Sequence, residues 1–185
     1  MTIFNKVSLT EQNIITTKVS KVVPVNYDKI NLISLENYYY KNFQNTSEWS
    51  YLKDYINIDD DKNVTWIGDF IRDHYRLKFK RIPVLTNKAA IVIPQGHQIN
   101  YHHHIDEYDL KNNSSDISVI VTCKTGEKPS FIDFEYEQGR KRHMKYKQEL
   151  REKEVVIFNS ELRHAYSKNL NHEPTIILSF KFQLI

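Results

Sequence analysis

Three consecutive histidines, His102 to His104, are followed two residues later by Asp106. Side chains on an extended strand alternate between its two faces, so His102 and His104 share one face and His103 points to the other. Asp106 falls on the face of His104 if the extended geometry continues. A histidine and a carboxylate in this order supply two of the three ligands of a 2-His-1-carboxylate site. Such a site holds Fe(II) and leaves positions open for oxygen and a cosubstrate.

The third ligand must come from elsewhere in the chain, and His164 is the best candidate. It follows the apolar run VVIF at 155–158 and a short loop, so it opens a new strand. The long separation from His104 leaves room for several strands to bring the chain back alongside. We therefore predict that His104, Asp106 and His164 bind the metal and form the catalytic centre. Because an imidazole must be neutral to bind a metal, iron affinity should fall below about pH 6.

A second ligand set remains open. Gly96, His102, His104 and Glu107 nearly match the first cupin motif, with the acid one residue early. In that interpretation the ligands are His102, His104, Glu107 and His164. The enzyme would then need no keto acid as a cosubstrate.

The elements that position these residues change character near Pro83. After it, short segments rich in β-branched and aromatic residues alternate with turn signals, which is typical of an antiparallel sandwich or barrel, and a jelly roll fits best. The predicted strands are 89–94, 97–104, 116–124, 130–137, 143–150, 154–159 and 174–184.

Before Pro83, apolar residues recur at helical spacing in two tracts, 27–43 and 63–79, with a short strand expected at 17–25. We therefore predict a mainly β protein with α structure. Residues 1–82 would form an α-rich N-terminal extension packed on a jelly-roll, metal-binding core at 83–185.

Composition excludes several classes of protein. The 185 residues carry 26 Lys and Arg against 23 Asp and Glu. The resulting net charge of +3 allows binding to a polyanion but does not require it. One cysteine, Cys123, excludes a disulfide framework and a Cys-rich zinc module. The sequence shows no apolar stretch of membrane-spanning length, and its first residues lack the apolar region of a secretory signal. We expect a cytoplasmic protein without a membrane partner.

The tracts 93–106 (IPQGHQINYHHHID), 155–169 (VVIFNSELRHAYSKN) and 175–182 (TIILSFKF) carry a family resemblance. Together they resemble the double-stranded β-helix core of the 2-oxoglutarate/Fe(II) oxygenases, most closely the aspartyl/asparaginyl β-hydroxylase-like branch. The resemblance covers residues 83–185. It implies an oxidoreductase, a dioxygenase that hydroxylates its substrate with Fe(II) as cofactor and 2-oxoglutarate as cosubstrate.

One position departs from the family's pattern. The family usually has an Arg about ten residues past the distal histidine, where it pairs with the far carboxylate of 2-oxoglutarate; here the sequence reads Pro174-Thr175. Thr175 offers a hydroxyl, and Lys181 a cation on the same strand face. Lys124, at the end of an inner strand, offers a second cation. These three residues are the candidates for cosubstrate binding.

A basic tract at 139–147 interleaves cations with aromatic residues, which permits nucleic-acid binding. The acidic residues that follow it favour a solvated hairpin with a lysine-protected edge. The expected substrate is therefore a small molecule or a protein side chain. A catalytically inactive jelly roll that serves as a binding module is the alternative from a different class, suggested by the absent Arg.

Overall fold

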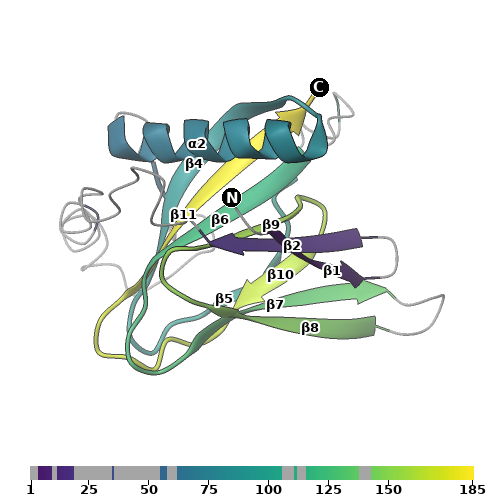
Figure 1. Cartoon of the computed structure of the whole chain (residues 1–185). Helices are drawn as coiled ribbons and strands as arrows, with labels where there is room; N and C mark the ends of the chain where they lie inside the picture. Colours follow the sequence, from purple (N-terminus) through teal and green to yellow (C-terminus); the bar gives the residue numbers. More distant parts are fainter. Residues whose placement is uncertain are drawn as a thin grey trace.

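The computed structural model describes residues 4–9, 12–18, 35, 55–57, 62–105, 111, 116–137 and 143–185. Two antiparallel sheets face each other, and one long helix, α2 (Lys62–Phe79), lies outside the larger sheet (Figure 1). The larger sheet contains, in spatial order, β1 (Phe4–Leu9), β2 (Gln12–Lys18), β9 (Glu154–Asn159), β6 (Asp116–Lys124), β11 (Thr175–Leu184), β4 (Pro83–Ile93) and β3 (Tyr55–Asn57). The smaller sheet contains β5 (Ile99–His102), β10 (Arg163–Tyr166), β7 (Ser130–Glu137) and β8 (His143–Leu150).

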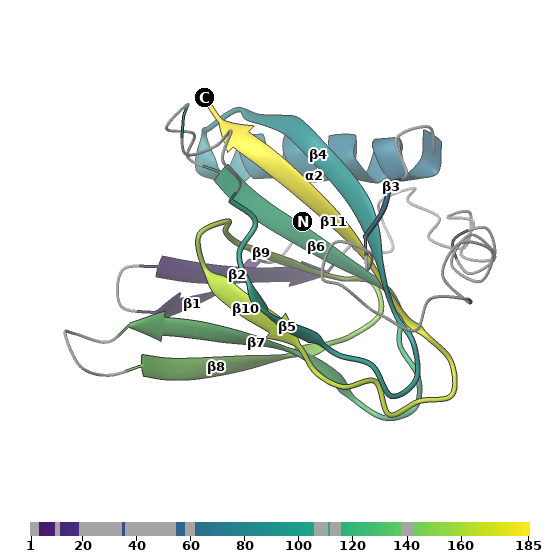
Figure 2. The ribbon, with the colours of Figure 1, turned by 180° about the vertical axis from the view of Figure 1, so that it is seen from behind.

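From β4 onward the chain passes back and forth between the two sheets. β4, β6, β9 and β11 lie in the larger sheet, and β5, β7, β8 and β10 lie in the smaller one. Among the described strands of this segment, β7 and β8 are the only two consecutive strands that belong to the same sheet. This arrangement is a jelly roll, so the predicted mainly β fold is confirmed. Figure 2 shows several of the connecting loops gathered at one end of the roll.

The core between the two sheets follows from the alternation of side chains along each strand. Inward positions are apolar along most of their length, and the largest fully buried side chains there include Phe134, Phe158 and Tyr166. Each buried side chain of this size contributes roughly 1.5–3 kcal/mol by leaving water. The inward face becomes polar toward one end of the roll, where Ser118, His164 and Ser160 are also buried.

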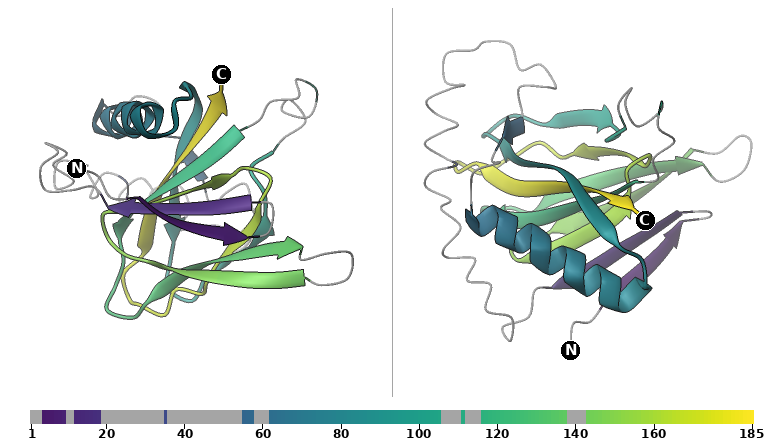
Figure 3. Two further views of the ribbon diagram at one scale, coloured as in Figure 1. Left: turned by 45° about the vertical axis from the view of Figure 1, so that its right-hand side comes forward. Right: turned by 90° about the horizontal axis from the view of Figure 1, so that it is seen from above.

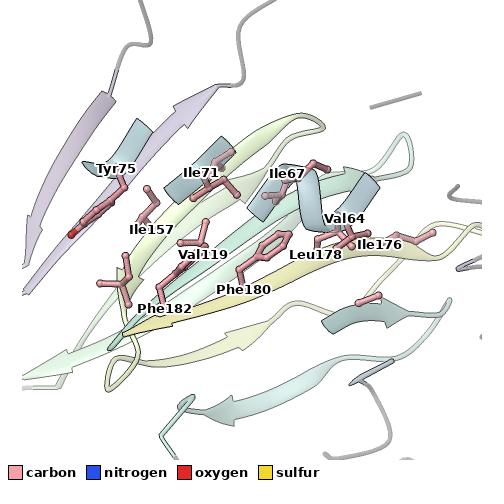
Figure 4. Packing of buried hydrophobic residues seen from close by; sticks show 14 of the residues in the cluster. Val64, Ile67, Ile71, Tyr75, Val119, Ile157, Ile176, Leu178, Phe180 and Phe182 are labelled. Carbon is pink, nitrogen blue, oxygen red and sulfur yellow. The ribbon is translucent and has the colours of Figure 1, made fainter. Parts of the chain in front are cut away.

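Helix α2 covers the opposite, outer face of the larger sheet. Its buried stripe of Val64, Ile67, Ile71 and Tyr75 packs on a second apolar cluster that includes Phe180 (Figure 4). Figure 3 shows the helix from above, lying along this sheet. The predicted helical tract 63–79 is therefore confirmed. Among the described residues, no helix is both long and apolar enough to cross a membrane.

The predicted α-rich character of residues 1–82 is not supported by the described part of that region. Besides α2 it contributes strands: β1 and β2 form a hairpin on β9, and β3 pairs with β4. The run Asn13-Ile14-Ile15-Thr16-Thr17 is rich in β-branched residues, and β2 gives the open edge of β9 a hydrogen-bonding partner. The tract 27–43 lies outside the described residues except for Leu35, which is helical and buried.

Candidate metal centre

Three imidazoles meet at the polar end of the roll. β5 pairs with β10 so that His102 stands directly opposite His164, and their ring centroids are 4.2 Å apart. His104 follows β5, and its ring centroid is 4.6 Å from that of His164 and 5.3 Å from that of His102. One nitrogen from each of the three rings lies within 4.8 Å of the others. The cluster is a set of neutral nitrogen donors of the kind that binds iron, zinc or copper.

Hydrogen bonds fix the other nitrogen of each ring. Nδ1–H of His102 donates to the carbonyl of Asn100 at 2.8 Å, and Nδ1–H of His164 donates to the carbonyl of Leu162 at 2.9 Å. A carbonyl can only accept, so Nε2 of each neutral ring carries a lone pair. Metal-binding histidines are held in the same way, with the second ring nitrogen donating to a carbonyl or carboxylate.

His164 supplies a direct test of whether these residues fit a metal. Its side chain is fully buried, and its Nε2 has no hydrogen-bond partner among the described residues. A buried acceptor left without a partner costs about 1–3 kcal/mol, and such groups are rare in native proteins. A metal ion at the point where the rings meet would complete the coordination of this nitrogen, so the residues fit a metal site.

The three rings are held neutral. Burial lowers the pKa of His102 to about 4, although its hydrogen bond to Asn100 opposes the shift. Burial also lowers the pKa of His104 to about 3, with further lowering by the charges of His102 and Lys181. The pKa of His164 lies well below its usual value because of burial and the neighbouring His104 and His102. At neutral pH all three imidazoles can therefore act as ligands without first releasing a proton.

Aromatic side chains surround the buried ring of His164. Phe158 meets it edge-on at 4.8 Å between centroids, Tyr166 lies at 5.8 Å and Phe134 at 6.1 Å. These rings come from β9, β10 and β7 and form the apolar layer immediately inside the site. An apolar shell of this kind limits the access of water to a metal and to what binds on it.

The structure brings together two of the three predicted metal ligands, His104 and His164. The third, Asp106, lies outside the described residues, as does Glu107 of the cupin interpretation. His102, which had a ligand role only in that interpretation, is a full member of the cluster. His103 is exposed and is not a member of the cluster, as strand alternation predicts.

The three candidates for cosubstrate binding lie at two different ends of the roll. Lys181 pairs in register with Ser118, whose hydroxyl contacts His104, so Lys181 is close to the histidines. Lys124 lies six residues farther along β6, about 20 Å away at 3.3 Å per residue, and forms an ion pair with Glu173 at 3.3 Å.

Thr175 lies at the same end as Lys124. It is buried, and its hydroxyl is 3.2 Å from that of Ser130. Of the three candidates, Lys181 is therefore the one that the fold places beside the imidazoles.

Comparisons with known proteins agree with this architecture. No family model matches the sequence, and no curated protein matches it. The structure is similar to that of SnoK, a non-haem α-ketoglutarate-dependent carbocyclase from nogalamycin biosynthesis. The TM-score is 0.63 and the identity 8%, over 94% of this chain and 80% of SnoK.

Two further enzymes of known structure are similar. A prolyl-4-hydroxylase from Pseudomonas putida gives a TM-score of 0.56 at 12% identity, over 91% of this chain and 87% of the hydroxylase. The α-ketoglutarate-dependent epimerase SnoN gives a TM-score of 0.62 at 10% identity, over 90% of this chain and 76% of SnoN. The chain has the fold of these enzymes. The more specific resemblance to the aspartyl/asparaginyl β-hydroxylase-like branch stays a prediction.

Proposed function

We propose that the protein is a non-haem Fe(II) oxygenase that uses 2-oxoglutarate to hydroxylate a small molecule or a protein side chain. The observation that carries the proposal is the convergence of His104 and His164 with His102 at one end of a jelly roll, where no described residue satisfies the Nε2 of His164. The fold neighbours support it, since one structure of SnoN holds Fe³⁺ and α-ketoglutarate. Bound together, Fe(II) and 2-oxoglutarate supply the oxidation of a substrate C–H bond by dioxygen.

In this proposal His104 and His164 bind the iron, and Asp106 supplies the carboxylate that completes the set. Paired strands fix the position of His164, and the apolar rings behind it keep water out. Lys181 holds the far carboxylate of 2-oxoglutarate, in place of the Arg that the family usually has. A lysine forms a weaker, single-point contact with a carboxylate than the two-pronged contact of an arginine.

A second candidate function is favoured by the position of His102. If His102 rather than Asp106 completes the set, the ligands are the three imidazoles and the carboxylate of Glu107. That set corresponds to the cupin-type metalloenzyme, which needs no keto acid.

An anaerobic titration separates the two functions. Fe(II) is added to the purified protein, followed by 2-oxoglutarate, and the visible charge-transfer band of an iron–keto-acid chelate is recorded. The 2-oxoglutarate proposal predicts a band that requires both additions and is absent in Asp106→Ala. Iron binding without a band, abolished in His102→Ala and retained in Asp106→Ala, would support the cupin-type function. Absence of iron binding would leave the inactive binding module.

The role of Lys181 has its own test with a matched control. Lys181→Met should raise the 2-oxoglutarate concentration that half-saturates the band by at least about tenfold, because a charge-assisted contact is lost. Fe(II) affinity should stay close to that of the wild type. Lys124→Met removes the same charge at the other end of the roll and should leave the 2-oxoglutarate titration unchanged. Equal effects of the two variants would contradict this assignment.

A further inference from the structure

His104 differs from the other two histidines in how its ring is held. His102 and His164 lie on paired strands and each donates to the carbonyl two residues earlier in the chain. His104 follows the last residue of β5, so no strand pairing orients it. Its Nδ1 instead lies 2.7 Å from the hydroxyl of Ser118 on β6. The position of this ring therefore depends on side chains that are distant in sequence.

A second serine supports the first. The hydroxyl of Ser118 lies 2.8 Å from that of Ser160, and both serines are completely buried. Ser160 also fixes the backbone of His104, because the amide of His104 donates to the carbonyl of Ser160 at 2.9 Å. The loop after β9 thus holds His104 through its main chain, and through Ser118 it holds the ring as well. Neither serine belongs to the predicted ligand sets.

The direction of the hydrogen bond between Nδ1 of His104 and the hydroxyl of Ser118 decides which nitrogen of His104 can bind a metal. If Ser118 donates to Nδ1, the proton of the neutral ring lies on Nε2, which then cannot bind a metal. If Nδ1–H donates to Ser118, Nε2 carries a lone pair. Only the second direction lets Nε2 of His104 join the set of nitrogen donors that the three rings form. A metal site built from the three rings therefore requires the proton of His104 on Nδ1.

We propose that Ser118 is a positioning residue that accepts the Nδ1 proton of His104, and that Ser160 holds Ser118 in place for this role. The pair keeps Nε2 of His104 unprotonated and aimed at the point where His102 and His164 meet. This inference rests on the proposed metal site. Outer partners of metal-binding histidines typically change metal affinity 10–100-fold when they are removed.

The first test is made on the metal-free wild-type protein. Long-range ¹H–¹⁵N correlation spectra distinguish the two neutral tautomers of each histidine, and the signals lost in His104→Gln identify those of His104. We expect the Nδ1-protonated form. A spectrum with the proton on Nε2 would overturn the proposal, and this result does not depend on whether any metal binds.

The second test is an anaerobic titration with Co(II). Ser118→Ala should weaken Co(II) binding about 10–100-fold, and Ser118→Thr, which keeps the hydroxyl, should restore most of the affinity. Ser130→Ala is the matched control, because Ser130 is also buried and bonded to a hydroxyl, that of Thr175, at the opposite end. The Ser130→Ala variant should be less stable than the wild type but should bind Co(II) with the same affinity.

Wild-type affinity in Ser118→Ala, or equal weakening in Ser130→Ala, would overturn the assignment of Ser118. A wild-type protein that binds no Co(II) would overturn the proposed metal function instead, and the tautomer spectrum would then decide the role of Ser118 by itself.

Discussion

Two buried polar clusters lie at opposite ends of the roll, and they differ in whether their hydrogen bonds are complete. At the turn end, formed by residues 94–98, 125–129 and 167–174, the amide of Asn169 donates to the carbonyls of Ile93 and Glu173, and its oxygen accepts from Asn171. Asn171 in turn both accepts from and donates to the backbone of Lys128. Every polar atom of these two side chains has a partner.

At the histidine end, formed by His102, His104, Ser118, Ser160 and His164, the Nε2 of His164 has no partner in the part of the chain that the structure describes. The Nε2 of His164 is buried and unsatisfied, and it lies where two other imidazoles converge. A complete network stabilises and specifies the fold, whereas an incomplete one costs stability unless something binds there. We infer that the turn end serves structure and that the histidine end is suited to bind a ligand, because among the described residues three imidazoles converge on an unsatisfied atom only at the histidine end.

Lowering the pH should destabilise the histidine end far more than the turn end, and this is the largest difference that we expect between them. A histidine with a folded pKa near 4 and an unfolded pKa near 6.5 binds fewer protons in the folded state between these values, so stability is full above pH 6.5 and is lost as the pH falls toward 4. For His102 the loss between pH 7 and pH 5 is about 2 kcal/mol, and His104 adds a similar amount. Urea denaturation of the metal-free protein at both pH values measures it.

A matched variant assigns this acid sensitivity to the histidine end. His102→Gln should reduce the slope of unfolding free energy against pH by about 1.4 kcal/mol per pH unit in this window, which corresponds to one proton. Equal stability of the wild type at pH 7 and pH 5 would show that these rings are not held neutral. The lowered pKa values also move the expected onset of acid competition for the metal from about pH 6 toward pH 4.

Loss of the asparagine network should be the next largest effect. Asn169→Ala leaves the carbonyls of Ile93 and Glu173 and the backbone amide of Asn171 without the partner that Asn169 provided, so we expect about 3 kcal/mol of destabilisation by urea denaturation at pH 7. Its metal affinity, measured on the folded protein, should stay that of the wild type. Asn5→Ala, on the exposed face of β1, is the control and should change stability little. A loss of metal affinity in Asn169→Ala would contradict the separation of the two ends.

Removing a histidine should have the smallest effect on the metal-free protein. His164→Leu deletes an unsatisfied acceptor as well as a hydrogen bond, so its unfolding free energy should lie within about 1 kcal/mol of the wild type. The wild type should gain about 2.7 kcal/mol when the metal concentration is 100 times the Kd, and the variant should gain nothing. Thermal denaturation with and without Co(II) measures both. An equal gain in the variant would show that the metal binds elsewhere.

The sequence predicted the jelly roll because its strands are short, β-branched and separated by turn signals. It predicted that His104 and His164 would meet, since each is near the end of a strand. It did not give His102 a place in the 2-His-1-carboxylate set, because alternation shows that His102 and His104 share a face but not which of them stands opposite His164. That depends on the register between β5 and β10, which is a tertiary property.

The serine pair and the N-terminal strands were also beyond sequence reasoning. Ser118 and Ser160 are ordinary residues in a strand and a loop, and their role arises only when β6 and β9 become neighbours. The hairpin of β1 and β2 completes an open sheet edge that cannot be located before the strand order is known. The α2 helix was predictable because its apolar stripe is a local pattern.

The central claim is that His104 and His164 bind one metal ion, and a crystal grown anaerobically with Fe(II) tests it most directly. We predict a single anomalous-scattering peak about 2.1 Å from the Nε2 atoms of His104 and His164, and the same map would show whether His102 or Asp106 completes the set. A map with no peak between these rings, at an iron concentration that saturates binding in solution, would contradict the account.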